Sequence, residues 1–340
     1  MLGTIQRFAK SRFFGLFCAF ASGCFRAAIC YLTHFMRDGN GFKVNLYTCI
    51  LGLMYVKMWL LLSPKLDQIP QLLTNWKAWL LSGIMGSLSY TAAFQMFKYA
   101  PTSDSYSIFL GAELIAGIGV DYFILKKVIG RQAIVSVPLA IVGILLVGQP
   151  YFLFGTDDQL LATDYPDHTL GCLVSVVGGV GVVLWWGVCG TSLQNTHTSF
   201  IIFAYAVFSI LIGSAVMELW NITWCYVHLA DRVICVCLSF CDIMNIVTAL
   251  NAISLESIYV TSIVRTAFLA AFFVADETLL NEPFNWASVL GGVSIFVSVG
   301  AEAIHKIAFG AKRLVAAASS SSADSERQPL IEEKADCSLD

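Results

Sequence analysis

The feature that most constrains this chain is a series of apolar segments, each about as long as a helix that crosses a lipid bilayer. Their predicted ranges are 13–35, 44–62, 77–98, 102–123, 132–150, 169–189, 198–219, 230–250, 256–275 and 286–306. About 20 apolar residues are needed to cross the hydrocarbon core, and a helix is required because lipid offers the backbone no hydrogen-bond partner. The sequence therefore predicts an all-α integral membrane protein with ten transmembrane helices.

Composition supports this prediction and excludes several other classes of protein. Hydrophobic residues make up 57% of the 340 residues, and charged residues only 13%. Soluble globular domains are about 45–50% apolar and about 25% charged, so the shortage of charge is the larger departure. It argues against a disordered chain, a nucleic-acid-binding protein and a soluble enzyme with a charged surface. The short loops leave little room for a catalytic domain, so we expect no enzymatic activity.

The cysteine and histidine residues give no indication of a metal site. Most of the 11 cysteines lie inside apolar segments, where a thiol behaves as a small hydrophobe. Cys235, Cys237 and Cys241 lack the second Cys/His pair that a tetrahedral zinc site needs. We therefore expect no metal and no cofactor.

The charges in the loops predict the orientation of the chain in the membrane. Basic residues gather in alternate connections, at Arg7, Lys10, Arg12, Lys65, Lys77, Lys126, Lys127, Arg131, Lys306, Lys312 and Arg313. The connection 151–168 has acidic residues and no basic one, and so does the connection 276–285. Because lysine and arginine favour cytosolic loops, both termini of this multi-pass protein are predicted to lie in the cytosol.

The second half of the chain repeats the first at an offset of 152 residues. Residues 102–105 (Thr-Ser-Asp-Ser) align with residues 254–257 (Ser-Leu-Glu-Ser), and Gly148 aligns with Gly300. Each half holds five apolar segments, and an odd number of crossings inserts the second half upside down relative to the first. The prediction is two inverted five-helix repeats, an arrangement that places a substrate site near the middle of the membrane and permits alternating access.

Short motifs in both halves resemble those of a known superfamily. They are residues 99–105 (Tyr-Ala-Pro-Thr-Ser-Asp-Ser), 147–155 (Val-Gly-Gln-Pro-Tyr-Phe-Leu-Phe-Gly), 262–266 (Ser-Ile-Val-Arg-Thr), 281–283 (Asn-Glu-Pro) and 291–292 (Gly-Gly). In these motifs the chain resembles the drug/metabolite transporter superfamily in its EamA-repeat form, and within it the G branch of solute carrier family 35. The resemblance covers roughly residues 13–307, and it implies ten helices in two EamA-like repeats that carry a small organic solute.

The spans, loops and resemblance together predict how the chain is divided. The predicted parts are a cytosolic N-terminus (1–12), a first EamA-like repeat (13–150), an acidic lumenal or extracellular loop (151–168), a second EamA-like repeat (169–307) and a disordered cytosolic tail (308–340).

Four ionisable side chains lie near the centres of predicted spans, where burial is costly and a functional role is the default. They are Arg26, Glu113, Asp242 and Arg265. Glu113 and Arg265 are separated by the repeat offset, so the two repeats bring them to matching depth and we expect them to meet. In one interpretation these two form a permanent ion pair that offsets its own burial. In the other, Arg26 and Arg265 neutralise an anionic substrate, and the two carboxyl groups are counter-ions or carriers of a coupled proton.

Other polar residues extend the candidate site or mark features outside it. Tyr90, Gln95 and Asn245 are assigned to the substrate cavity, although packing and hydrogen bonds between helices also account for such residues. Asp121 lies near one end of its span, where we expect it to be within reach of water. Asn221 begins an Asn-Ile-Thr sequon in a predicted outer loop, which is either a glycosylation site or an unused sequon.

The C-terminal tail contains a candidate sorting signal. Glu326, three intervening residues, then Leu330 and Ile331 resemble the acidic dileucine motif that clathrin adaptors bind on the cytosolic side of membrane proteins. This motif favours endosomal or lysosomal membranes or the plasma membrane, with the endoplasmic reticulum and Golgi as alternatives.

The sequence thus predicts a secondary transporter for a small organic solute, expected to be anionic, such as a carboxylate or a nucleotide sugar. Its expected partners are this solute, a coupled proton, the lipid bilayer and a clathrin adaptor, and no nucleic acid. The alternative is a membrane scaffold or regulator that keeps the transporter fold without transport. Two departures from the superfamily pattern support this alternative: Glu113, where proline is frequent, and Phe268, where an acidic residue is frequent.

Overall fold

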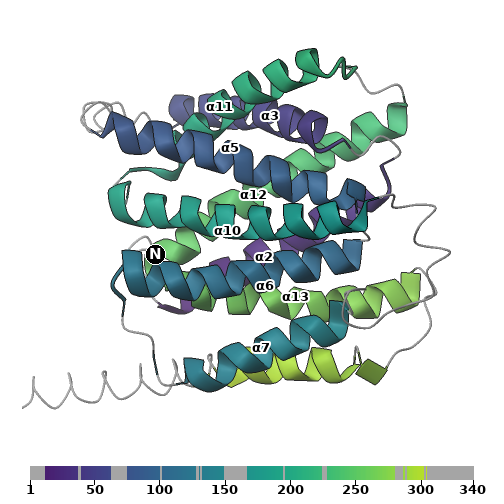
Figure 1. The fold of residues 1–340 in the computed structure, drawn as a ribbon. Coiled ribbons are helices and arrows are strands. Elements are labelled where there is room, and N and C mark those ends of the chain that lie inside the picture. Colours follow the sequence, from purple (N-terminus) through teal and green to yellow (C-terminus); the bar gives the residue numbers. More distant parts are fainter. Residues whose placement is uncertain are drawn as a thin grey trace, which may run out of the picture.

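The computed structural model of this chain is helical throughout the parts that it describes (Figure 1). The described residues are 12–36, 40–62, 75–99, 102–127, 130, 132–148, 167–193, 196–223, 228–279, 286–287, 289–301 and 304. The elements are α2 (Arg12–His34), α3 (Gly41–Leu62), α5 (Trp76–Tyr99), α6 (Thr102–Gly119), the π-helical turn η2 (Val120–Ile124), α7 (Ala133–Gly148), α10 (His168–Ser192), α11 (Thr198–Leu219), α12 (Leu229–Leu255) and α13 (Ile258–Leu279).

The helices coincide with the predicted spans. Each of the first nine spans corresponds to one helix or to α6 with η2, and a further apolar helix, Val289–Ala301, lies within the tenth. Among the described residues, five stretches are long and apolar enough to cross a membrane: Phe14–Thr33, Ser105–Ile124, Thr169–Ser192, Thr198–Leu219 and Leu229–Leu255. Large apolar side chains such as Phe123, Ile134 and Leu219 point outwards, as a surface in contact with lipid requires.

Local sequence explains where several helices begin or end. The carboxylate of Asp167 accepts a hydrogen bond from the backbone N–H of Leu170 at 3.1 Å and caps α10. At the end of α6, the N–H of Leu125 reaches back five residues to the carbonyl of Val120 at 2.9 Å. This wider turn is η2, and single π-turns inside helices are frequent at functional sites.

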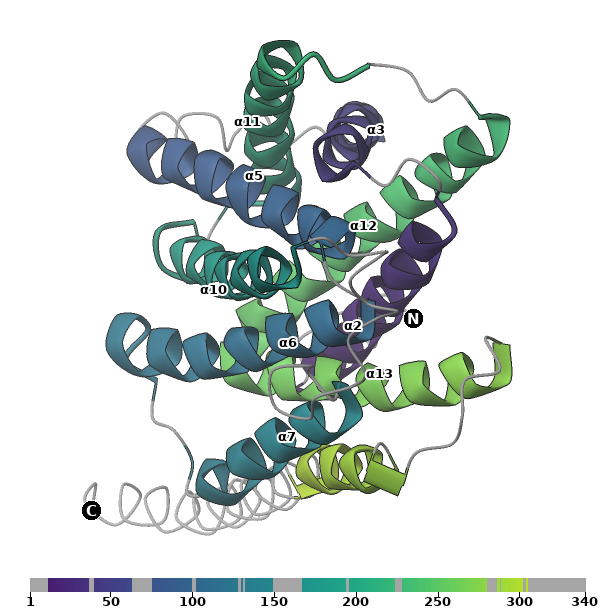
Figure 2. The ribbon, with the colours of Figure 1, turned by 45° about the vertical axis from the view of Figure 1, so that its right-hand side comes forward.

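Helices from the two halves of the chain interleave. Most of the packing of α2 is against α12 and α13, and α5 packs on α10 and α11 (Figure 2). Glycine lets the backbones of α10 and α6 come close together, because a Cβ at Gly179 of α10 would lie 2.5 Å from the carbonyl oxygen of Phe109 in α6. The two halves are therefore parts of one packed bundle over the described residues.

Helices α2 and α12 run antiparallel. Near one end of the pair, a Cβ at Gly15 would lie 2.7 Å from the side chain of Glu256, and further along Ser22 donates a hydrogen bond to Asn245 at 2.8 Å. Residues with higher numbers in α2 therefore contact residues with lower numbers in α12. This register decides which side chains of the two helices face each other.

Some predictions concern residues outside the described parts. These are most of the acidic loop 151–168, the motifs at 149–155 and 281–283, and the sorting signal with Glu326, Leu330 and Ile331.

Candidate functional site

Six polar side chains form a buried group in the interior of the bundle, which we call the inner cluster. They are Arg26 of α2, Tyr90 of α5, Glu113 of α6, Asp242 and Asn245 of α12 and Arg265 of α13. None of the six side chains is more than 2% exposed. The structure thus brings together, from five helices, all but one of the residues that the sequence assigned to the cavity.

Glu113 and Arg265 form an ion pair at the centre of the inner cluster. Nη1 of Arg265 donates to both carboxylate oxygens of Glu113, at 2.9 and 3.0 Å. The guanidinium carbon lies 5.0 Å from the ring centroid of Trp186, a cation–π distance. The contact expected from the repeat offset is therefore present. An ion pair this deep costs desolvation, and its Coulomb attraction offsets that cost while both partners remain.

Arg26 and Asp242 lack such partners. Nε and Nη2 of Arg26 and both carboxylate oxygens of Asp242 have no hydrogen-bond partner among the residues that the structure describes. The guanidinium of Arg26 lies 4.8 Å from the ring centroid of Phe109, and it is close enough to Asp242 to interact electrostatically. Buried polar groups are nearly always hydrogen-bonded, so these two call for a ligand, ordered water or an ion.

Asn245 and Tyr90 connect the charged residues to an aromatic wall. Asn245 accepts a hydrogen bond from Ser22 and donates one to the hydroxyl of Tyr90 at 3.4 Å. The ring of Tyr90 meets Trp185 edge-on at 5.5 Å and lies 5.3 Å from Tyr205. Sequence analysis overlooked Phe109 and Tyr205, because aromatic residues in apolar spans are too common to single out.

Gln95 is engaged elsewhere. Its carbonyl oxygen accepts the backbone N–H of Gly41 at 3.0 Å, and its amide donates to Tyr99 at 3.4 Å. The first of these bonds satisfies an N–H in the first turn of α3, and the second lies within α5. Neither bond joins Gln95 to the inner cluster. Asn221 is exposed directly after α11, and the sequon's Thr223 accepts a hydrogen bond from Lys43 at 3.3 Å.

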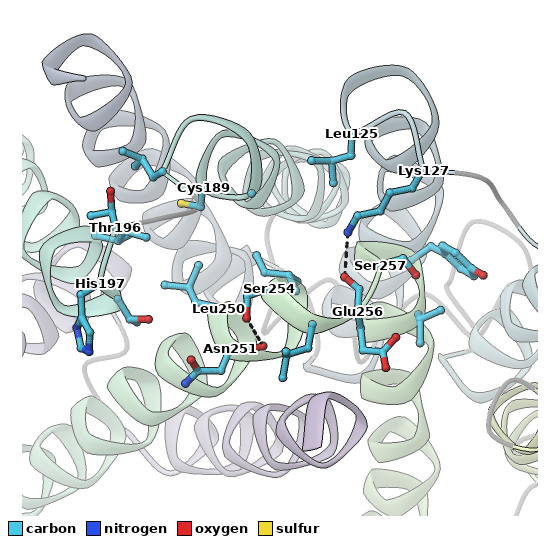
Figure 3. A pocket seen from close by; sticks show the side chains of 18 residues that line it. Leu125, Lys127, Cys189, Thr196, His197, Leu250, Asn251, Ser254, Glu256 and Ser257 are labelled. Atoms are coloured by element: carbon cyan, nitrogen blue, oxygen red, sulfur yellow. Dashed lines mark hydrogen bonds between the residues drawn. The ribbon is translucent and has the colours of Figure 1, made fainter. Parts of the chain in front are cut away.

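A cavity of about 600 Å³ opens where α10 and α12 end and α11 and α13 begin (Figure 3). It is lined by Leu125, Lys127, Cys189, Gly190, Leu193, Thr196, His197, Thr198, Ile201, Leu250, Asn251, Ile253, Ser254, Leu255, Glu256, Ser257, Tyr259 and Val260. At its rim Lys127 donates to the backbone carbonyl of Glu256 at 2.9 Å. The cavity therefore lies between the end of α6 with η2 and the α12–α13 connection.

The cavity approaches the inner cluster. Cys189, Leu250 and Val260 line it, and Trp186, Asn245 and Arg265 lie one to two turns further along the same three helices. At about 1.5 Å of rise per residue, the separation along the helices is roughly 5–8 Å. The cavity thus ends about one to two helical turns from the inner cluster.

The structure corrects the expectation for Asp121. Instead of lying within reach of water it is completely buried, and its carboxylate accepts the backbone N–H of Tyr259 at 2.8 Å. That N–H belongs to the first turn of α13, which has no acceptor within its own helix. Lys127 lies 3.9 Å from the same carboxylate. Asp121 is therefore a cap for α13, supplied from η2.

An all-helical membrane protein with charges buried inside its bundle is the class that this fold and site define. Residues 13–149 match the EamA-like transporter family. Solved structures include one, described only as a crystal structure of a protein, with a TM-score of 0.62 and 13% identity; the match covers 85% of this chain and 95% of that one. That likeness shows the fold alone.

The chain is also similar to solute carrier family 35 member G1 from two mammals. It is 19% identical to the Mus musculus protein over 235 residues and 20% identical to the Homo sapiens protein over 231 residues. The matches cover 68% and 67% of this chain but only 63% and 62% of those proteins, less than two thirds of their length. The resemblance to EamA-type drug/metabolite transporters and to solute carrier family 35 is confirmed.

Proposed function

We propose that this protein is a secondary transporter that carries a small organic solute with an anionic group across a membrane by alternating access. The observation that carries the proposal is the inner cluster, in which buried polar atoms of Arg26 and Asp242 have no hydrogen-bond partner among the described residues and lie beside an ion pair. Charges at such depth are costly and are typical of substrate and ion pathways. The likeness to a transporter family supports the same function.

The proposed architecture is ten transmembrane helices in two inverted repeats, residues 13–150 and 169–307. The packing supports it, because helices at the same position in the two halves make corresponding contacts. The counterparts are α2 and α10, α5 and α12, and α6 and α13. Thus α2 packs on α12 as α10 packs on α5, and α6 packs on α10 as α13 packs on α2. Repeats related in this way allow one half to rock against the other around a central site.

The proposed orientation has both termini in the cytosol, with the cavity opening on the same side. Lys126 and Lys127 lie at this end of the bundle, and basic residues favour cytosolic loops. The dileucine-like signal in the tail would then be accessible to clathrin adaptors, which supports endosomal, lysosomal or plasma membranes. Glycosylation of Asn221 on the opposite side belongs to the same proposal.

Counterflow in reconstituted liposomes tests transport directly. The purified protein is assayed with a panel of carboxylates, nucleotide sugars and amines, and at least one is expected to exchange. If none does while the protein remains folded, transport is rejected.

Arg26→Lys tests the anion site, because lysine keeps the charge and loses the planar fork that binds two carboxylate oxygens. We expect the transport KM for an anionic solute to rise by about tenfold or more. Arg232→Lys, at an exposed position on α12, is the matched control and is expected to leave KM unchanged. Equal effects of the two changes would contradict the assignment.

A scaffold or regulator without transport is the second candidate. The observation in its favour is that Tyr90, Trp185 and Trp186 are almost completely buried and fill the centre of the bundle. Counterflow separates the two candidates, because a scaffold keeps its stability and exchanges no solute.

A further inference from the structure

We propose that the inner cluster binds a zwitterion, a solute whose carboxylate pairs with Arg26 and whose ammonium group pairs with Asp242. This inference rests on the proposed transport function and names the class of its substrate. It follows from which atoms of the cluster are satisfied and which are not.

The unpartnered donors of Arg26 indicate a carboxylate. Nε and Nη2, the atoms without partners, lie on the same edge of the planar guanidinium group. Their N–H bonds on that edge point in parallel and match the two oxygens of one carboxylate. The ring centroid of Phe109 lies 4.8 Å from the guanidinium carbon, and a phenyl ring offers the Nε and Nη2 donors no oxygen or nitrogen acceptor.

The unpartnered acceptors of Asp242 indicate an ammonium group rather than a bound proton. Neither of its carboxylate oxygens has a hydrogen-bond donor within the part of the chain that the structure describes. A single proton would occupy one oxygen and create an O–H donor that itself needs an acceptor. An ammonium group brings three N–H donors, enough for both oxygens. An ammonium group on the solute therefore satisfies Asp242 better than a separately bound proton does.

Arg26 and Asp242 lie at the same level of the bundle. Ser22 and Asn245 are hydrogen-bonded across the antiparallel pair α2–α12. Arg26 lies about one turn beyond Ser22, and Asp242 about one turn beyond Asn245, in the same direction along the pair. One small molecule bound beside both residues would therefore meet both charges.

The other two charged residues of the inner cluster do not change the need for one carboxylate and one ammonium group. Glu113 and Arg265 neutralise each other's charge through two hydrogen bonds from Nη1, and of the buried side-chain atoms of this pair only Nε of Arg265 is left without a partner among the described residues. What is left is one positive and one negative side chain, each nine-tenths or more buried. A solute with one charge of each sign satisfies both and adds no net charge to the interior, whereas a simple anion leaves Asp242 uncompensated.

The test is a series of linear ω-amino acids, from glycine to 6-aminohexanoate, each compared with its deaminated carboxylate and its decarboxylated amine. Thermal stability of the purified full chain is measured at equal ligand concentrations, because a ligand of the folded state raises the melting temperature. We expect at least one amino acid to bind at least tenfold more tightly than both of its matched controls. Carboxylates that bind as tightly as the amino acids, or a series in which no amino acid binds, would overturn the proposal.

Asp242→Asn separates the two halves of the zwitterion site. The variant is expected to lose tenfold or more in affinity for the amino acid while keeping its affinity for the matched carboxylate. Asp231→Asn, a buried carboxylate on the same helix outside the inner cluster, controls for loss of charge and is expected to change neither. Equal loss for both ligands in Asp242→Asn would contradict the ammonium site.

Counterflow on the same preparation keeps this proposal distinct from the transport proposal. Exchange of carboxylates without preference for zwitterions would reject the zwitterion and leave transport standing. Absence of exchange by every solute would reject transport itself.

Discussion

Glu113 and Arg265 are the pair of residues whose contact has the clearest energetic consequence. Both are buried, and the pair joins α6 to α13 across the two halves of the chain. A buried pair of this kind adds little net stability compared with apolar residues, but the loss of one partner leaves an uncompensated charge. The single and double variants should therefore behave very differently.

Glu113→Ala is expected to lower the free energy of unfolding by about 3–5 kcal/mol, because Arg265 is left buried without its partner. The double variant Glu113→Ala with Arg265→Ala should be more stable than the sum of the single losses predicts. Unfolding in mixed micelles measures all three variants as a double-mutant cycle.

Glu218→Ala, which removes an exposed carboxylate from α11, is the control and should change stability little. Additive effects at positions 113 and 265 would show that the pair is not coupled. If transport is lost in the double variant after its stability returns, the pair serves function as well as structure.

At the scale of the elements, the ends of the helices hold the two halves together. Asp121, placed by the π-turn η2, accepts a backbone N–H of α13 at 2.8 Å. Lys127 extends this contact to the carbonyl that ends α12 at 2.9 Å. A cap supplied by another helix fixes the position of that helix as well as its first turn.

Asp121→Ala is expected to lower the free energy of unfolding by about 1–3 kcal/mol, because the N–H of Tyr259 loses its acceptor inside the protein. Asp121→Asn keeps an acceptor oxygen and should cost less. Lys127→Ala, at a partly exposed side chain 3.9 Å from the carboxylate, should cost less than about 1 kcal/mol. Chemical unfolding in detergent measures the three changes, and a larger loss for Lys127→Ala would refute the cap.

The contact between α10 and α6 depends on glycine. Gly179→Ala places a methyl group 2.5 Å from the carbonyl oxygen of Phe109, so the helices have to separate near Glu113. Gly111→Ala is the matched control, since its Cβ would meet nothing closer than Ile144 at 4.0 Å. We expect a loss of about 1–3 kcal/mol for the first change and none for the second, measured by thermal unfolding. Equal stability of both variants would contradict the close approach.

The helices and the contact between Glu113 and Arg265 could be predicted from the sequence, whereas the contacts of side chains with backbone groups could not. The spans were predictable, because each is an apolar run of membrane length, and the Glu113–Arg265 contact followed from the repeat offset. The expectation that Asp121 is within reach of water was wrong, because Asp121 is buried and accepts the backbone N–H of Tyr259. The bond of Gln95 to the backbone N–H of Gly41 was not foreseen either, and its assignment to the cavity stays a prediction. Every residue except proline has a backbone N–H, so the sequence cannot indicate which N–H a buried side chain will bind. That partner is known only from the structure.

At the scale of the whole molecule, the packing of helices from one half against helices from the other is the main feature. The cavity lies at one end of this bundle, and Trp220, which follows α11, lies at the other. If the bundle spans the membrane as proposed, these two ends face opposite compartments.

Labelling of single cysteines tests that orientation. In a background without the 11 native cysteines, Ser254→Cys and Trp220→Cys each place an exposed thiol at one end. With sealed microsomes, whose cytosolic face is outward, a membrane-impermeant maleimide should label Ser254→Cys and should label Trp220→Cys only after detergent is added. Labelling of both thiols before detergent, or the reverse pattern, would refute the predicted sidedness.

The antiparallel pairing of α2 with α12 also sets a condition on how the protein is made. Helix α12 begins about 200 residues after α2 ends. At about 5–20 residues per second, ribosomes need roughly 10–40 s to synthesise that interval. Throughout it, Arg26 sits on a helix whose main partner has not yet been translated. If α2 enters the bilayer as proposed, this charge has to be shielded from lipid, for example by the insertion machinery, until the second half of the chain is made.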